Sequence, residues 1–200
     1  MAVAQSNGDA PKTFAGEALA DSDRSWSIDA VSSQLIDRPL DYFTAEHNRQ
    51  RGVANILSRI ADEAFDIQGA PDVIDFLEGD YELNLGDKED ALYPLMREFC
   101  SPADGIDRIL DRLRGEQVGI RTICKDVARI LRSKLDSGAA FSAAERRRIA
   151  SLANMIRENI AFENGVLLPI ARVRLKDADL AALGEKLKSR RAKIAKTDKP

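Results

Sequence analysis

The apolar residues recur every three or four positions over four long stretches, a spacing that places them on one face of an α-helix. The stretches cover about residues 40–64, 71–99, 105–135 and 142–170. No run of Val, Ile and Thr alternates with polar residues between hairpin turns, so a β-sheet is not expected. We therefore predict an all-α protein whose four long helices pack as an up-down antiparallel four-helix bundle, because the connections between them are short.

The two ends of the chain differ from its middle in composition. Residues 1–25 are rich in Ala, Ser, Gly and Asp and have no apolar periodicity, which predicts a disordered N-terminal tail. Residues 193–200 are expected to form a basic C-terminal tail. The residues between the tails, 26–192, have the length of one ordinary domain and are predicted to form the bundle.

Local signals predict where the helices begin. Pro39 suits the first turn of the first long helix. Ser142 and Glu145 have the spacing of a capping box, in which each side chain binds the free backbone N–H of the other residue. An apolar cluster in residues 26–36 predicts a short cap over the bundle, and Asp177 is expected to cap a final short helix. Short extra helices are therefore expected near both ends.

Composition excludes several classes of function. The net charge of −3 provides no basic field for phosphate groups, so nucleic acid is not an expected partner. No apolar run approaches the ~20 residues of a membrane-spanning helix and no secretory signal is visible, so we expect a cytoplasmic protein that does not bind membranes. Cys100 and Cys124 are expected to be reduced core residues. Without a Ser/His/Asp set, a Gly-rich phosphate loop or zinc spacing, we do not expect an enzyme.

Each of the four apolar stripes is interrupted near its middle by polar residues. The interruptions are His47 in the first stretch, Asn84 and Lys88 in the second, Gln117 with Arg121 nearby in the third, and Asn159 and Glu163 in the fourth. In an up-down bundle, interruptions halfway along each helix meet at one depth, where buried polar groups must be hydrogen-bonded or paired. We therefore predict a polar layer in the core.

A weak internal repeat relates the second and fourth stretches. The segment 84–94 (NLGDKEDALYP) aligns with the segment 159–169 (NIAFENGVLLP), so that a polar pair, a leucine and a proline recur at equal offsets. Residues four apart share a helix face. Each segment is therefore expected to direct a matched pair of polar side chains into the bundle.

This pattern resembles the hemerythrin-like (HHE cation-binding) family over about residues 35–192. In that family, His-x-x-x-Glu on two helices, each followed by a Leu-Phe-Pro-like ending, joins histidines from the other helices to hold two irons. The resemblance implies that His47, at the end of the segment 38–47 (RPLDYFTAEH), matches a metal-binding histidine. It also implies that Glu163 matches a bridging carboxylate. Iron is therefore the cofactor that the resemblance suggests.

The other ligand positions of the family are substituted in this chain. Asn84 and Asn159 occupy the histidine positions of the two motifs, Gln117 that of the third helix, and Lys88 the second glutamate position. An alternative register for the second helix places Leu85 and Glu89 at its two positions and also lacks a histidine. Imidazole and carboxylate bind iron well, whereas amides bind it weakly and an ammonium has no free lone pair. We therefore expect no di-iron centre.

The substitutions lead to one hypothesis and several simpler interpretations. We hypothesise that Lys88 replaces a missing positive charge and forms a buried ion pair with Glu163. In this hypothesis, His47 and the amides complete a hydrogen-bonded layer. Alternatively, His47 is an ordinary core histidine, Lys88 and Glu163 extend to solvent at the edge of the stripe, and the amides set helix register.

The expected function follows from the substituted ligands. A hemerythrin-like domain without its metals would be a non-enzymatic regulatory or interaction module that contacts another protein or a second copy in a homodimer. If some metal binding remains, the protein is an O2, NO or iron sensor that holds iron through His47, Glu163 and acids such as Glu46, Asp87 or Glu89. A third interpretation is a pH- or redox-responsive switch that depends on His47.

Overall fold

The computed structural model describes residues 28–62, residue 67 and residues 70–197. The predicted N-terminal tail, residues 26 and 27 of the predicted cap and the last three residues of the predicted basic tail lie outside the described residues. Every regular element of the described part is helical, and no residue there is in a strand. The prediction of an all-α fold is confirmed.

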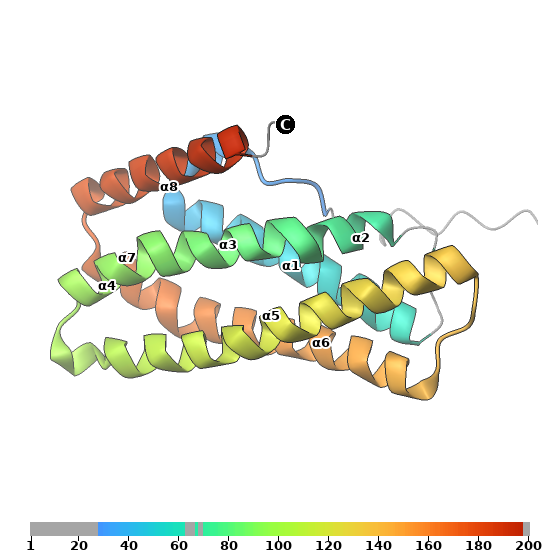
Figure 1. The fold of residues 1–200 in the computed structure, drawn as a ribbon. Helices are drawn as coiled ribbons and strands as arrows, with labels where there is room; N and C mark the ends of the chain where they lie inside the picture. The colour runs from blue at the N-terminus through green and yellow to red at the C-terminus, as the bar shows by residue number, and fades with distance from the viewer. Residues whose placement is uncertain (1–27, 63–66, 68–69, 198–200) are drawn as a thin grey trace, which may run out of the picture.

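Four long helical rods form the bundle (Figure 1). The first and third rods are α1 (Pro39–Ala61) and α5 (Ile106–Ser137). The second rod is the unbroken succession of α2 (Pro71–Asp75), η4 (Phe76–Asp80), α3 (Tyr81–Asp87), η5 (Lys88–Leu92) and α4 (Tyr93–Phe99). The fourth is α6 (Ala143–Phe162), η7 (Glu163–Leu167) and α7 (Leu168–Arg174). Consecutive rods run in opposite directions, which confirms the predicted up-down antiparallel bundle.

Further helices lie outside the rods. A 3-10 helix, η2 (Ser33–Asp37), precedes α1, and a second one, η6 (Pro102–Asp104), connects α4 to α5. The last helix, α8 (Asp177–Thr197), packs against α1, η2 and η5. It is not the short element predicted, because its 21 residues include part of the predicted basic tail. Ala, Lys and Arg favour helix, so this composition continues the helix through its last turns.

Capping groups explain several helix ends. The predicted capping box is present, since the Ser142 N–H donates to Glu145 Oε2 at 2.7 Å and the Glu145 N–H donates to Ser142 Oγ at 3.3 Å. The backbone N–H and the hydroxyl of Ser142, together with Lys134, lower the pKa of the Glu145 carboxyl to about 2. Gly105 before α5 and Gly138 after it have φ values of 63° and 64°, which side chains other than glycine rarely tolerate.

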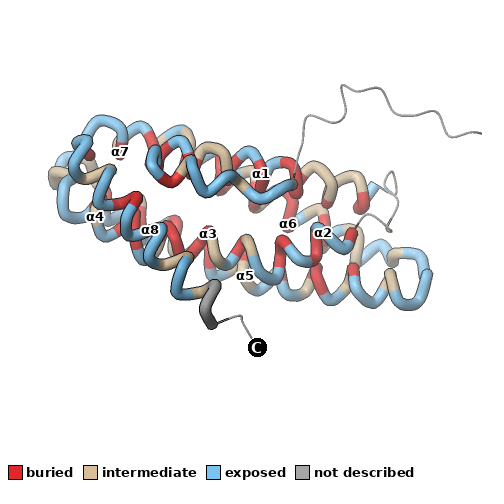
Figure 2. Tube along the Cα trace, turned by 90° about the horizontal axis from the view of Figure 1, so that it is seen from above, coloured by how far each residue is buried: buried red, intermediate tan, exposed pale blue. Residues whose placement is uncertain are grey.

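The polar layer divides the apolar core into two clusters. One cluster surrounds Leu57, Tyr81 and Val127 at one end of the bundle, and the other surrounds Phe43, Leu92 and Leu110 at the other end. Figure 2 shows that buried residues recur along each helix between exposed ones, as expected for amphipathic helices. The residues that separate the two clusters are those that interrupt the apolar stripes in the sequence.

Candidate functional site

All six side chains of the predicted layer are buried. None of His47, Asn84, Lys88, Gln117, Asn159 and Glu163 exposes more than 2% of its surface. All four rods contribute to the layer. The contributing elements are α1, α3 with η5, α5, and α6 with η7. Gln50, one helical turn after the histidine on α1, is also buried there and was not among the predicted residues. The interior of the bundle therefore contains a polar layer instead of side chains that extend to solvent.

Glu163 is the centre of this layer. The Lys88 ammonium donates to both of its carboxylate oxygens, and each Nζ–O distance is 2.8 Å. The His47 Nε2 atom lies 2.5 Å from Oε2 of the same carboxylate. On its other side, the His47 ring shares a 2.7 Å hydrogen bond between Nδ1 and Asn164 Oδ1. One carboxylate therefore joins a lysine from the second rod to a histidine from the first.

The electrostatics favour an ionised Glu163. Full burial opposes ionisation, but the attraction of the Lys88 ammonium and of His47 outweighs it and lowers the pKa of Glu163 to about 2. The two hydrogen-bonding neighbours act in the same direction because they donate to the charged form. The layer therefore contains a carboxylate at neutral pH, and its principal counter-charge is part of the chain.

The amides of the layer are only partly hydrogen-bonded. Gln50 Nε2 donates to Asn84 Oδ1 at 2.7 Å, and Gln117 Nε2 donates to the Tyr93 hydroxyl at 2.7 Å. Both polar atoms of the Asn159 side chain lack a hydrogen-bond partner among the described residues. The structure therefore connects two of the predicted amides to neighbours and leaves the third without a bond.

Lys88 and Glu163 occupy equivalent places in the backbone. Each is the first residue of a π-helical segment, η5 or η7, and its carbonyl accepts from the N–H five residues later. A proline, Pro94 or Pro169, follows that N–H by one residue and has no N–H of its own to donate. The two halves of the sequence repeat thus contain the same π-helical irregularity, and the polar pair of each half lies in the interior of the bundle. Sequence reasoning did not predict the π-helical geometry, which is common at functional sites.

The alternative register of the second rod does not reach the centre of the layer. The Glu89 carboxylate accepts two hydrogen bonds from Arg121, at 3.0 and 2.9 Å, toward the outside of the bundle. Arg121 also binds Glu82, so its guanidinium is held between two acids. Arg121 therefore lies beside the polar layer and not inside it.

A second buried polar cluster was missed by sequence reasoning. Asp87 is fully buried, and its carboxylate accepts from Arg190 and Arg191 of α8. Tyr42 donates to the buried Glu46 at 3.0 Å and contacts Asp87 at 3.4 Å. Both arginines lie within the predicted bundle domain, but no contact was predicted for either of them. The only local signal was a pair of acids beside apolar positions, at Glu46 and Asp87.

The comparisons with known proteins agree with this architecture. The model of the hemerythrin HHE cation-binding domain matches residues 38–171, which is more than half of the chain. The chain belongs to the hemerythrin HHE family. No curated protein and no solved structure matches it. The predicted family is therefore confirmed, and the matched residues include every residue of the polar layer.

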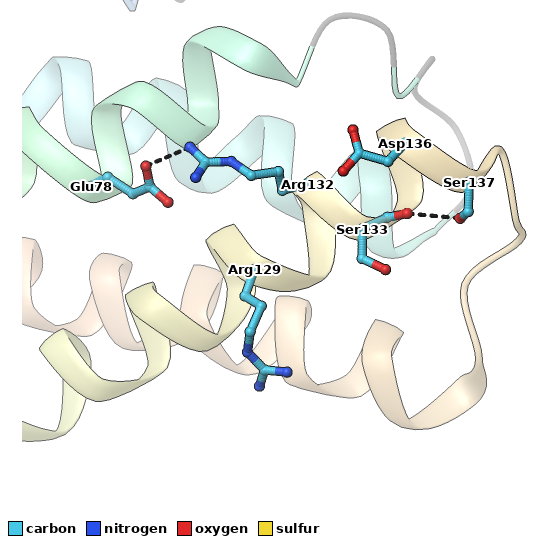
Figure 3. Close-up of a pocket in the computed structure, with 6 residues that line it drawn as sticks. All are labelled: Glu78, Arg129, Arg132, Ser133, Asp136 and Ser137. Atoms are coloured by element: carbon cyan, nitrogen blue, oxygen red, sulfur yellow. Dashed lines mark hydrogen bonds and ion pairs between the residues drawn. The ribbon is translucent and has the colours of Figure 1, made fainter.

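The described part of this hemerythrin domain contains no group of three or more His, Cys, Asp or Glu side chains arranged to hold a metal ion. None of its described helices is long and apolar enough to cross a bilayer. A surface hollow is lined by residues of α5 and η4 (Figure 3). Arg132 binds Glu78 there at 2.6 Å, while Arg129 points away from that ion pair. This hollow contains none of the predicted site residues.

Proposed function

We propose that this hemerythrin domain holds no di-iron centre and acts as a non-enzymatic regulatory or interaction module. One observation carries the proposal: the Lys88 ammonium donates to both oxygens of Glu163. Those are the oxygens that a bridging carboxylate would offer to two metals. A cation built into the chain thus uses the lone pairs that iron would need.

The donor atoms of the layer do not fit two irons. His47 is the only histidine of the chain, and its Nε2 atom is directed at the carboxylate. The Asn84 carbonyl oxygen already accepts from Gln50, and amide oxygens are weak ligands for iron. The Lys88 ammonium also repels a metal cation at this position. The residues present therefore support an ion-paired layer and not the family's metal centre.

A buried ion-paired layer supports a structural role for the core, which leaves the surface of the protein to make functional contacts. Its groups are all buried, so they offer no access to a substrate. A buried ion pair is a poor source of stability but restricts which partners a helix accepts inside a bundle, because a wrong partner leaves a charge unpaired. We propose that the layer defines one arrangement of the rods, and that the protein works through contact with another protein or a second copy.

Iron content tests the proposal. Protein purified after expression in iron-supplemented medium is expected to contain less than about a tenth of an iron per chain and to show no oxo-bridge absorption band, because the ligands are too weak. Glu163→Gln provides a matched control, since its iron content is expected to equal that of the parent. Two irons per chain in the parent, lost in Glu163→Gln, would refute the proposal.

A residual sensor is the second candidate, and one contact favours it. His47 Nε2 and Glu163 Oε2 are retained family ligands, and they face each other at 2.5 Å. Iron is the metal that the family resemblance suggests. A single iron held there would have to displace Lys88 from the carboxylate. Titration with Fe(II) under NO would then show a nitrosyl absorption band in the parent and none in His47→Gln.

A further inference from the structure

A cleft of about 420 Å³ lies between the second rod and α5. Its inner wall is formed by Leu77 of η4, Tyr81 of α3 and Cys124 of α5, none of which exposes more than 4% of its surface. All three belong to the apolar cluster around Leu57 and Val127. A cleft of this size with an apolar wall is suited to a small organic molecule.

The hydroxyl of Tyr81 is the polar group of the inner wall. It is buried and has no hydrogen-bond partner among the described residues. Burial, more than any neighbouring group, raises the pKa of this hydroxyl well above its usual range, so it remains an uncharged O–H. The hydroxyl also experiences the charges of Cys124 and Arg121, which line the cleft, and of Glu163 in the polar layer. It therefore lies between the cleft and the layer, where a buried hydroxyl requires a partner.

The backbone beside the cleft is irregular. The Tyr81 N–H donates to the Phe76 carbonyl, five residues earlier, which makes η4 a π-helical segment. Unlike η5 and η7, this segment is followed by no proline at the corresponding position, which is Glu82, and it contributes no residue to the polar layer. It does contribute Leu77 and Glu78 to the cleft. Because π-helical turns are frequent at functional sites, η4 is a second indication of a ligand here.

The charges around the mouth of the cleft are balanced. They belong to two acids, Glu78 and Glu82, and two bases, Arg121 and Lys125. Arg132 binds Glu78 at 2.6 Å, and Arg121 binds the two oxygens of Glu82 at 3.1 and 2.9 Å. Lys125 is exposed, where water solvates an ammonium well. A charged ligand would have to compete with these contacts, so the cleft favours an uncharged one.

We propose that this cleft binds a small, uncharged and mainly apolar molecule with one oxygen that accepts a hydrogen bond from Tyr81. Simple phenols, alcohols and ketones have this chemistry. The apolar body of the ligand contacts Leu77 and Cys124, and its oxygen supplies the partner that the buried hydroxyl requires. The inference goes beyond the proposed function and does not depend on the ion pair, because the cleft contains neither Lys88 nor Glu163. It gives the module a ligand site separate from the polar layer.

Two probes that differ in a single hydroxyl group, p-cresol and toluene, test the site in the full-length protein. Titration followed by amide NMR is expected to give saturable shifts around Tyr81 and Cys124, with a Kd for p-cresol of about 1 mM or tighter. Tyr81→Phe keeps the ring and removes the hydroxyl. It should bind p-cresol about tenfold more weakly than the parent and bind toluene equally well.

Two further variants complete the experiment. Tyr93→Phe is the matched control, because it removes a buried hydroxyl outside the cleft and should leave the affinity for p-cresol unchanged. Cys124→Leu places a larger side chain on the inner wall and should weaken the binding of both probes. It also replaces Tyr81→Phe as the test if that variant loses the helical content of the parent.

Three results would overturn the proposal. The first is the absence of saturable shifts in the parent with p-cresol up to about 10 mM. The second is an equal affinity of p-cresol for the parent and for folded Tyr81→Phe, or for the parent and Cys124→Leu. The third is tighter binding of 4-hydroxyphenylacetate than of p-cresol, which would show that the cleft selects an anion. Iron content does not enter any of these results, so they are independent of the proposed function.

Discussion

The ammonium of Lys88 lies 2.8 Å from both carboxylate oxygens of Glu163, and each of these residues begins a π-helical segment of its rod. The two segments come from the two halves of the internal repeat, so the ion pair joins equivalent positions. In the family, glutamates are expected at both positions to bridge metals. Here a lysine faces the glutamate, so the chain itself supplies a positive charge between the two helices.

The first prediction concerns the coupling within this pair. Lys88→Met should lower the free energy of unfolding by about 3–5 kcal/mol, because it leaves Glu163 buried without its principal counter-charge. Lys88→Met with Glu163→Leu should be more stable than Lys88→Met, since the unpaired carboxylate is then gone. Urea unfolding of the parent, both single variants and the double variant measures the coupling. If the stability losses of the two single variants add up to the loss of the double variant, the two side chains do not interact.

The second prediction concerns acid stability. The pKa of Glu163 is lowered to about 2 in the folded protein, whereas a glutamate in an unfolded chain titrates near ~4.3. The folded state therefore keeps this group ionised while the unfolded state takes up a proton. Its contribution is fully present above about pH 4.5 and is lost as the pH falls toward 2, with a slope of up to about 1.4 kcal/mol per pH unit.

Comparison with a double variant isolates that contribution. Glu145 also has a pKa of about 2, but it is retained in Lys88→Met with Glu163→Leu and contributes equally to both proteins. As the pH falls from 4.5 to 2, the unfolding free energy of the parent should therefore decrease relative to that of the double variant. A difference that stays constant over this range would contradict the lowered pKa of Glu163.

The third prediction separates two buried asparagines that look equivalent in the sequence. Neither polar atom of the Asn159 side chain has a hydrogen-bond partner in the described part of the chain, so Asn159→Leu should raise the unfolding free energy by about 1–3 kcal/mol. Asn84 accepts from Gln50, so Asn84→Leu should lower it by a similar amount because Gln50 is left unpaired. Denaturant unfolding of both variants measures these two changes in stability. Destabilisation of equal size in both would mean that Asn159 is satisfied by a group other than a neighbouring side chain.

The fourth prediction reverses the substitutions. A variant with Asn84→His, Lys88→Glu, Gln117→His and Asn159→His has donors at all the ligand positions that the family resemblance implies. It should bind about two irons per chain where the parent binds almost none, because imidazole and carboxylate replace amides and an ammonium. The same variant with His47→Gln serves as the control and should bind less. Failure of the first variant to bind iron while folded would show that the backbone no longer fits the metals.

Much of the fold was predictable from local pattern. The three- and four-residue spacing indicated the rods. The polar interruptions at His47 and Gln117 indicated a common depth, and both side chains are buried in the structure. That depth was readable because an up-down bundle converts position along each helix into position across the core. Capping at Ser142 was readable for a similar reason, since the groups involved are only three residues apart.

The remaining features depend on contacts that no local pattern encodes. Arg191 of α8 contacts Tyr42 of α1 across 149 positions of the chain, and no local pattern around either residue indicates that contact. The π-helical turns at Lys88 and Glu163 move the acceptor of a backbone N–H from the fourth to the fifth preceding residue, and helical periodicity in the sequence does not reveal a change of that size. The difference between Asn84 and Asn159 depends on whether Gln50 reaches them, which only the packed structure shows.

The central claim is that an amine of the chain takes the place of metal ions in this bundle. An anomalous difference map at the iron edge, from crystals of protein expressed with added iron, tests it most directly. It should show no peak in the polar layer and continuous density from Lys88 to the Glu163 carboxylate. An iron peak between His47 and Glu163, or a Lys88 side chain directed to solvent, would contradict the claim.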